Sequence, residues 1–147
     1  MKTVAISGGF DPIHVGHVRL LKASKALGDK LIVILNNDNW LKAKKGYAFL
    51  NQKERKAVLE AIKWVDKVVI TSHPKKITDV SVCKELAKIK PDIFANGGDR
   101  KSGNIPEYEL CDKLRIKMVF NIGGGKAQSS SDLVKKVRKL KKIQKNF

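Results

Sequence analysis

Two histidines near the start of the chain, His14 and His17, carry side chains that can donate hydrogen bonds while staying uncharged. They are three residues apart, so a helix that begins here places both imidazoles on one face of its first turn. Gly8 and Gly9 stand before them, directly after a short apolar run. Glycines at a strand-to-helix turn let backbone N–H groups approach an anion closely, and the helix N-terminus adds partial positive charge. These residues therefore predict a phosphate-binding turn with a pair of neutral donors.

Zinc binding is the alternative use of this histidine pair. A zinc site needs further ligands at a suitable spacing, whereas His73, Cys83 and Cys111 are scattered along the chain. Gly16, between the paired histidines, has no side chain and so leaves room for a flat ligand. We therefore favour phosphate binding and expect no metal ion held by the protein alone.

The residues from Gly8 to His17 resemble the G-x-F-D-x-x-H-x-G-H signature of the cytidylyltransferase-like nucleotidyltransferases. This superfamily includes glycerol-3-phosphate cytidylyltransferase, heptose-phosphate adenylyltransferases, phosphopantetheine adenylyltransferase and archaeal FAD synthetase. The resemblance implies transfer of a nucleoside monophosphate from CTP or ATP to a small phosphorylated acceptor, with release of pyrophosphate. It makes His14 and His17 catalytic donors to the α- and β-phosphates. It also assigns these residues to the nucleotide site: Gly8, Gly9, Phe10, Asp11 and Gly16.

A second polar segment follows the continuous apolar run at residues 30–36, which is typical of a strand buried on both faces. The resemblance gives Asp38, just after this strand, a role toward the acceptor, although an ordinary polar turn explains it equally well. Residues 40–50 are interpreted as a basic loop. The resemblance makes Lys44 a phosphate contact in this loop, and a solvated lysine cluster is the alternative.

Residues 51–54 form a capping-box pattern and predict the start of a helix. Glu54 and Arg55 resemble an E-R pair that the family carries at this place. The resemblance implies that the arginine organises the preceding loop, and a purely structural role for both residues is the alternative.

A glycine turn follows the strand expected at residues 92–95. It resembles the family's G-G-D segment, in which backbone groups and an acid border the nucleotide. Asp99 could instead cap the next segment. The resemblance assigns Asn96, Gly97, Gly98 and Asp99 to the nucleotide site and Arg100 to the acceptor site.

The last motif follows a strand expected at residues 116–120 and leads into a helix from about Asp132. It resembles the family's I-S-[ST]-[ST] motif, whose hydroxyls hold the triphosphate, although serines at a helix start are also ordinary N-caps. The glycerol-3-phosphate cytidylyltransferases have R-T-E-G before the hydroxyls, where residues 124–127 read Gly-Gly-Lys-Ala. This departure weakens the case for CTP and makes Lys126 the expected catalytic cation beside the leaving pyrophosphate. The triphosphate site then includes Gln128, Ser129, Ser130 and Ser131.

The final helix is amphipathic. Leu133, Val137 and Leu140 form its apolar stripe, and most of its lysines lie away from that stripe. A solvated basic face is the usual meaning of such a pattern.

Length and composition indicate one globular domain over residues 1–147, with 42% hydrophobic residues. We find no apolar run long enough to span a bilayer and no signal peptide, so we expect a cytoplasmic protein without a membrane partner. The cysteines are far apart and are expected to be reduced. A homodimer stays an open expectation.

The net charge of +17 would suit a nucleic-acid-binding domain, which is the rival from another functional class. Attraction of polyanionic substrates and a simple bias toward lysine explain the charge as well. Aromatic residues make up only 6% of the chain, and no helix-turn-helix pattern stands out. We therefore expect no nucleic acid partner, and we keep an inactive nucleotide sensor of the same fold as a third reading.

The elements that position these residues alternate between apolar strands and helices. This alternation predicts an α/β, Rossmann-like, doubly wound sheet of five parallel strands with helices on both faces. The glycine turns all follow strands, so we expect them to gather at one edge of the sheet. The triphosphate implies Mg²⁺ as a cofactor that arrives with the nucleotide, and Asp11 would border the site or act through that ion.

Overall fold

The computed structural model describes residues 1–98, 105–123 and 130–145, with the side chains of the final helix described as far as Lys141. Its strands are β1 (Thr3–Gly8), β2 (Lys30–Leu35), β3 (Lys67–Ile70), β4 (Ile93–Ala95) and β5 (Lys117–Val119). Its helices are α1 (Val15–Lys25), α2 (Asp38–Lys45), α3 (Gln52–Glu60), α4 (Cys83–Ile89), α5 (Glu107–Lys113) and α6 (Ser130–Lys145).

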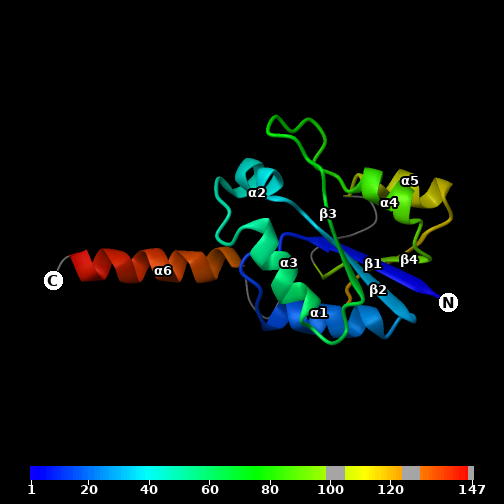
Figure 1. Cartoon of the computed structure of the whole chain (residues 1–147), viewed down its shortest axis with the longest axis horizontal. Coiled ribbons are helices and arrows are strands. Elements are labelled where there is room, and N and C mark those ends of the chain that lie inside the picture. Colours follow the sequence, from blue (N-terminus) through cyan, green and yellow to red (C-terminus); the bar gives the residue numbers. More distant parts are fainter. Residues whose placement is uncertain (99–104, 124–129, 146–147) are drawn as a thin grey trace.

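The strands form one parallel sheet in the order β3-β2-β1-β4-β5. Figure 1 labels the first four of them. The first strand lies in the middle, because the chain winds outward on one side through β2 and β3 and then on the other through β4 and β5. The doubly wound fold predicted from the sequence is confirmed. In such a sheet the ligand site lies where the winding reverses, beyond the carboxyl ends of β1 and its neighbours.

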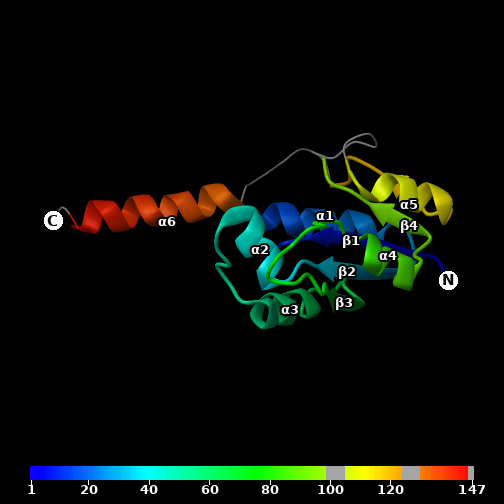
Figure 2. The same ribbon diagram turned by 90° about the horizontal axis from the view of Figure 1, so that it is seen from above.

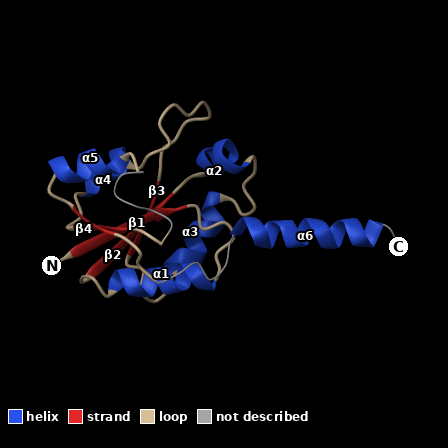
Figure 3. Cartoon of the chain, turned by 180° about the vertical axis from the view of Figure 1, so that it is seen from behind, coloured by secondary structure: helices blue, strands red, loops and turns tan. Residues whose placement is uncertain are grey.

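Helices cover both faces of the sheet, as the view coloured by secondary structure also shows (Figure 3). Val4 and Ile6 of β1 pack toward Leu21 of α1 and Leu59 of α3 in one hydrophobic cluster. Ala5, between them in sequence, belongs to the opposite cluster with α4 and α5. The alternation follows from the two-residue period of a strand. It fixes β1, and the loop that follows it, at the centre of the molecule.

Helix α2 corrects the expectation of a basic loop at residues 40–50. The Asn37 side chain accepts a hydrogen bond from the Trp40 N–H at 3.0 Å and so caps the helix. Gly46, with φ of +84°, ends the helix in a left-handed turn. The sequence carries both end signals of a helix, an asparagine N-cap and a C-terminal glycine. Asparagine also occurs commonly in turns, so Asn37 was interpreted as a turn residue and the helix from Asn37 to Gly46 was not predicted.

Helix α6 extends away from the sheet and its covering helices in both ribbon views (Figures 1 and 2). It begins at Ser130, slightly before the start expected near Asp132. None of the described helices combines the length and the apolar character needed to cross a bilayer.

Candidate active site

The carboxyl edge of the sheet brings the predicted glycine turns together, as far as they are described. The Asn36 N–H donates to the Gly8 carbonyl at 2.9 Å and so joins the ends of β1 and β2. On the other side, the Asn96 N–H donates to the Val119 carbonyl at 2.8 Å, and the Ile122 N–H donates to the Asn96 carbonyl at 3.0 Å. The turns after β4 and β5 are therefore bonded neighbours, next to the β1 loop.

The histidine pair starts helix α1. His14 is its N-cap, and the Nδ1 atom of His14 accepts from the Gly16 N–H at 3.1 Å. In return, the Nδ1 atom of His17 accepts from the His14 N–H at 3.2 Å. The two rings stack with their centroids 3.9 Å apart. The main chain thus holds both imidazoles side by side, on one face of the first turn as the spacing predicted.

These bonds also decide where the imidazole protons lie. A ring nitrogen that accepts a hydrogen bond carries no proton, so the neutral form of each ring has its N–H at Nε2. The pKa of His17 is lowered to about 3, mainly by burial and in addition by the nearby His14 and Lys45. His17 is therefore an uncharged N–H donor at neutral pH.

Phe10 packs against the histidine pair, and the glycines that precede it, Gly8 and Gly9, allow close packing of the loop. Phe10 is buried with φ of +50°, and its ring meets that of His17 edge-on at 4.9 Å between centroids. A Cβ atom on Gly8 would lie 3.0 Å from the Phe10 ring, and one on Gly9 would lie 2.9 Å from Leu41 of α2. The glycines are thus needed for close packing of the loop. A contact of these residues with a nucleotide stays a prediction.

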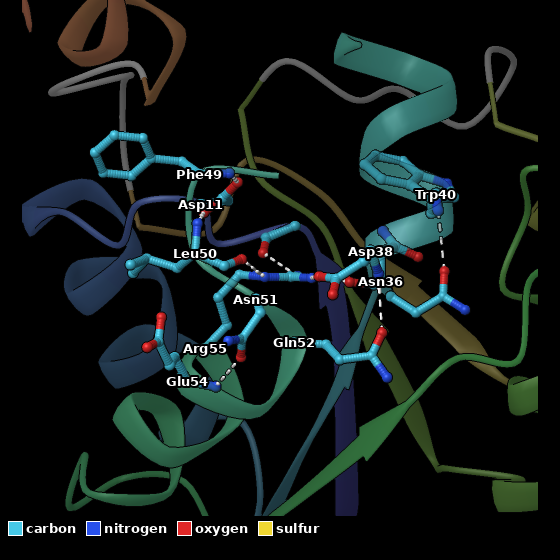
Figure 4. Close-up of polar contacts among 12 residues, drawn as sticks. Asp11, Asn36, Asp38, Trp40, Phe49, Leu50, Asn51, Gln52, Glu54 and Arg55 are labelled. Atoms are coloured by element: carbon cyan, nitrogen blue, oxygen red, sulfur yellow. Dashed lines mark hydrogen bonds and ion pairs between the residues drawn. The ribbon is translucent and has the colours of Figure 1, made fainter. Parts of the chain in front are cut away.

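Asp11 is almost fully buried, with 1% of its surface exposed. Its carboxylate accepts from the Phe49 N–H at 2.6 Å and from the Leu50 N–H at 2.7 Å (Figure 4). Both carboxylate oxygens therefore connect the segment after α2 to the loop between β1 and α1 (residues 9–14), which we call the histidine loop. No sequence pattern pointed to this task, because its partners are main-chain groups. The expected role of Asp11 toward a nucleotide or metal ion stays a prediction.

Arg55 of α3 is buried beneath the same loop, with 1% exposure. Its guanidinium donates to the Leu50 carbonyl at 2.9 Å, to the Gly9 carbonyl at 2.9 Å and to the Asn36 carbonyl at 2.6 Å. It also forms an ion pair with Asp38 at 2.7 Å (Figure 4). One side chain thus links the ends of β1 and β2 with the segment before α3. Asp38, the expected acceptor residue, is oriented by this pair.

The lysines of α2 differ in what they approach. The Lys44 ammonium lies 6.0 Å from the centroid of the Trp40 ring. Lys45 is close enough to His17 for its charge to lower the pKa of that residue. Sequence reasoning chose Lys44 while treating the segment as a loop. In a helix, neighbouring residues point about 100° apart, so Lys44 and Lys45 face different directions. The phosphate contact expected of Lys44 stays a prediction.

The serine motif reaches the site through Ser130, the first residue of α6. Its hydroxyl donates to the Pro12 carbonyl at 2.8 Å, and only 8% of the residue is exposed. The bond places the N-terminus of α6 beside the histidine loop, while Ser131 is half-buried. Several predicted residues lie outside the described part of the chain: Asp99, Arg100, Lys126, Gln128 and Ser129.

The turn after β4 is described as far as Gly98. Asn96 is buried, and its side-chain amide donates to the Phe94 carbonyl at 3.2 Å and to the Val119 carbonyl at 3.4 Å. Gly97 is half-buried and Gly98 is exposed. Asn96 thus joins the ends of β4 and β5, and the assignment of this turn to a nucleotide stays a prediction.

Comparison with known proteins identifies the group to which this geometry belongs. Residues 5–122 match the profile of the cytidylyltransferase-like family. This chain belongs to the cytidylyltransferase-like family. The resemblance seen in the histidine motif and the expectation of a nucleotidyltransferase enzyme are both confirmed at this level.

Relatives within the family differ in length and name. The chain is 44% identical to the FAD synthase of Pyrococcus abyssi over 98 residues, which cover 66% of this chain and 63% of that protein. It is 31% identical to the bifunctional protein HldE of Campylobacter concisus over 142 residues, or 95% of this chain and 28% of that protein. The chain thus spans less than two thirds of either relative.

A solved member of the same fold is a lipopolysaccharide core biosynthesis protein from Thermoplasma volcanium. Its crystal structure superposes with a TM-score of 0.70 at 28% identity, covering 86% of this chain and 99% of that one. The agreement supports the Rossmann-like fold of the cytidylyltransferase-like family for this chain.

The described residues do not form a metal site. Within residues 1–98, 105–123 and 130–145 there is no group of three His, Cys, Asp or Glu side chains able to hold a metal ion. His73, weighed earlier as a ligand, bonds instead to Thr71 and to the Ser81 carbonyl. The described side chains offer no cage for Mg²⁺, so the ion expected with the triphosphate stays a prediction about the substrate.

Proposed function

We propose that this chain transfers a nucleoside monophosphate from a nucleoside triphosphate to a small phosphorylated acceptor and releases pyrophosphate. The observation that carries the proposal is the stacked pair of imidazoles, His14 and His17, at the carboxyl edge of the sheet. Their Nδ1 atoms are occupied by main-chain N–H groups, which directs the donating Nε2–H atoms outward from the helix turn. Such donors suit phosphate oxygens whose negative charge rises during the reaction.

The acceptor supplies the nucleophile in this reaction. An oxygen of its phosphate attacks the α-phosphorus, a new P–O bond forms, and the bond to the β-phosphate oxygen breaks as pyrophosphate leaves. The acceptor phosphate is already an anion, so no side chain has to remove a proton from it. The protein's contribution is to orient the two reactants and to stabilise charge on the transferring phosphate.

Each side of the site has residues suited to one reactant. The N-terminus of α6, fixed by Ser130, carries partial positive charge and would hold the β- and γ-phosphates together with Lys45 and Lys126. Mg²⁺ bound to the triphosphate would neutralise part of the charge on the departing pyrophosphate. These assignments place the triphosphate on the α1 and α6 side of the loop.

The acceptor would lie on the α2 side of the histidine loop. A cavity of about 400 Å³ there is lined by Asn39, Lys42, Ala43 and Lys75. An amide and two ammonium groups suit a phosphorylated molecule with further polar groups. Asp38, held by Arg55, stands at the start of the same helix and would contact a hydroxyl or ring N–H of the acceptor.

ATP is the donor that the relatives favour. Two proteins of high identity are named FAD synthase, and FAD contains an AMP unit joined to flavin mononucleotide. Flavin mononucleotide is therefore the first acceptor to test. Sugar phosphates come second, because the Thermoplasma volcanium relative is named for lipopolysaccharide core biosynthesis.

A pyrophosphate-release assay with each ribonucleoside triphosphate, Mg²⁺ and a panel of phosphorylated acceptors tests the proposal. We expect release that requires both a triphosphate and one acceptor, with a nucleotidylated acceptor as the second product. Nucleotide binding without any release would instead indicate an inactive nucleotide sensor. Absence of both binding and release would remove the enzymatic reading and leave the basic nucleic-acid-binding domain.

A further inference from the structure

Helix α6 carries an apolar stripe that the described part of the protein leaves largely uncovered. Among the described residues, its contacts with the body come from its first three turns: Ser130 bonds to Pro12, Val134 is buried, and the Arg138 guanidinium lies 5.2 Å from the Tyr47 ring centroid. Val137, although it lies within these turns, is 50% exposed, and Leu140 is 62% exposed. All views show the helix projecting from the sheet (Figures 1, 2 and 3). Leu133 is half-buried, so the stripe is available to another molecule mainly through Val137 and Leu140.

The spacing of the stripe fits a partner helix. Leu133, Val137 and Leu140 are separated by four and then three residues, which is the d-a-d spacing of a coiled coil. Their side chains occupy a narrow arc, whereas a helix lying in a membrane interface presents a broader apolar face that usually includes aromatic residues. A nucleic acid would use the lysines and leave the aliphatic stripe exposed. The stripe thus favours a helix over either alternative.

The charges around the stripe define the partner further. Residues 130–145 contain seven Lys or Arg and a single acid, Asp132. In the heptad frame set by the stripe, Lys136 and Lys141 take the g and e positions that border it, and both are exposed. A second copy of this chain would bring like charges together, because each copy has a net charge of +17. The complementary partner has acids at its own e and g positions.

We infer that α6 is a docking helix for an acidic amphipathic helix of a partner protein, which packs along Leu133, Val137 and Leu140 and pairs its carboxylates with Lys136 and Lys141. The surface is separate from the histidine pair, so its occupation does not require the proposed transfer reaction. Its short length predicts a weak and reversible association.

The test uses the full chain and a designed helical peptide with Val at a, Leu at d and Glu at e and g. Titration at about 50 mM salt is expected to show saturable binding that weakens several-fold at about 300 mM, because the ion pairs are screened. Val137→Gln should weaken binding about tenfold. Val58→Gln is the matched control, since Val58 is a helical valine of α3 with 40% exposure. It should leave binding unchanged.

Charge reversal gives the sharper result. The double variant Lys136→Glu/Lys141→Glu should lose the acidic peptide and gain the same peptide with Lys at e and g. Unchanged binding in Val137→Gln, or no gain after charge reversal, would overturn the proposal. So would binding of vesicles containing phosphatidylserine, or of duplex DNA, that is tighter than peptide binding and depends on the same residues.

Discussion

The histidine loop and helix α6 are joined by the Ser130 hydroxyl, yet they are built on opposite principles. The loop is fixed from beneath by buried polar groups, since Asp11 and Arg55 are each 1% exposed and bind main-chain atoms of several segments. Helix α6 leaves Val137 and Leu140 in solvent. The difference teaches where precision is needed: groups that contact a transferring phosphate must be held in place, whereas a docking helix needs an accessible surface.

The largest expected effect comes from removing the buried guanidinium. Arg55→Met leaves Asp38 without its ion-pair partner and the carbonyls of Gly9, Asn36 and Leu50 without their donor. We expect the free energy of unfolding to fall by about 3–5 kcal/mol, measured by urea denaturation.

Lys56→Met is the matched control for this variant. Lys56 also lies on α3, but its pair with Glu60 spans 3.4 Å and both side chains are well exposed. Its loss should cost no more than about 0.5 kcal/mol. Similar costs for the two variants would show that the loop is not braced by Arg55.

Next in size is the effect of the histidines on turnover. His17→Ala should cost roughly 3 kcal/mol of transition-state stabilisation, judged from the loss of a single oxyanion donor. His14→Asn keeps a side chain that caps α1 but lacks the imidazole, so turnover should fall without loss of helix stability. Steady-state kinetics together with thermal unfolding separate the two effects. A folded variant with near-normal turnover would exclude a catalytic role for that histidine.

The pH dependence of stability reports on the partly buried imidazole of His17. Its pKa in the folded protein is about 3, below the ordinary value of 6.5. Between pH 3 and pH 6.5, the unfolded chain therefore binds a proton at this residue that the folded chain does not bind. Stability from this residue is complete above pH 6.5 and is lost as the pH falls toward 3, by at most about 1.4 kcal/mol per pH unit. Urea denaturation at several pH values should give a shallower slope for His17→Gln. An equal slope would place the titration elsewhere.

A smaller effect should distinguish neighbouring lysines of α2. Lys45→Ala should raise the KM for the triphosphate or lower turnover by about tenfold, a loss of roughly 1.4 kcal/mol, because its charge acts at the histidine pair. Lys44→Ala, the matched control, should change kinetics little, since its ammonium lies over Trp40. The reverse ranking would support Lys44, the residue predicted from the sequence, over Lys45.

The weakest interaction that we predict is the binding of nucleic acid. Duplex DNA should bind weakly at about 150 mM salt and with a steep salt dependence, because the basic surface provides charge without a base-reading element. Fluorescence titration of labelled duplexes measures this directly. Submicromolar and sequence-selective binding would mean that the basic surface, including α6, carries the main function. The histidine loop would then have the lesser role.

Most of the fold could be predicted from the sequence, because strands such as β2 contain a continuous apolar run, residues 31–35, and helices such as α3 begin at a recognisable cap. Helix α2 was missed although Asn37 and Gly46 mark its ends, because the same residue types also form turns. In the site, the spacing of His14 and His17 was enough to place them together. The bonds of Asp11 were not predictable, since its partners are main-chain N–H groups 38 and 39 residues away.

The central position of β1 also has a consequence for how the protein forms. Val4 pairs with Leu31 of β2 on one side and with Ile93 of β4 on the other. One of the two strands that flank β1 therefore comes late in the chain. During synthesis, the segment that carries the histidines leaves the ribosome long before β4 can close beside it. Closure of so long a loop is slow. The segment with the histidines is therefore synthesised early but gains its β4 neighbour late, and substitutions in β4 can delay its assembly without changing a residue of that segment.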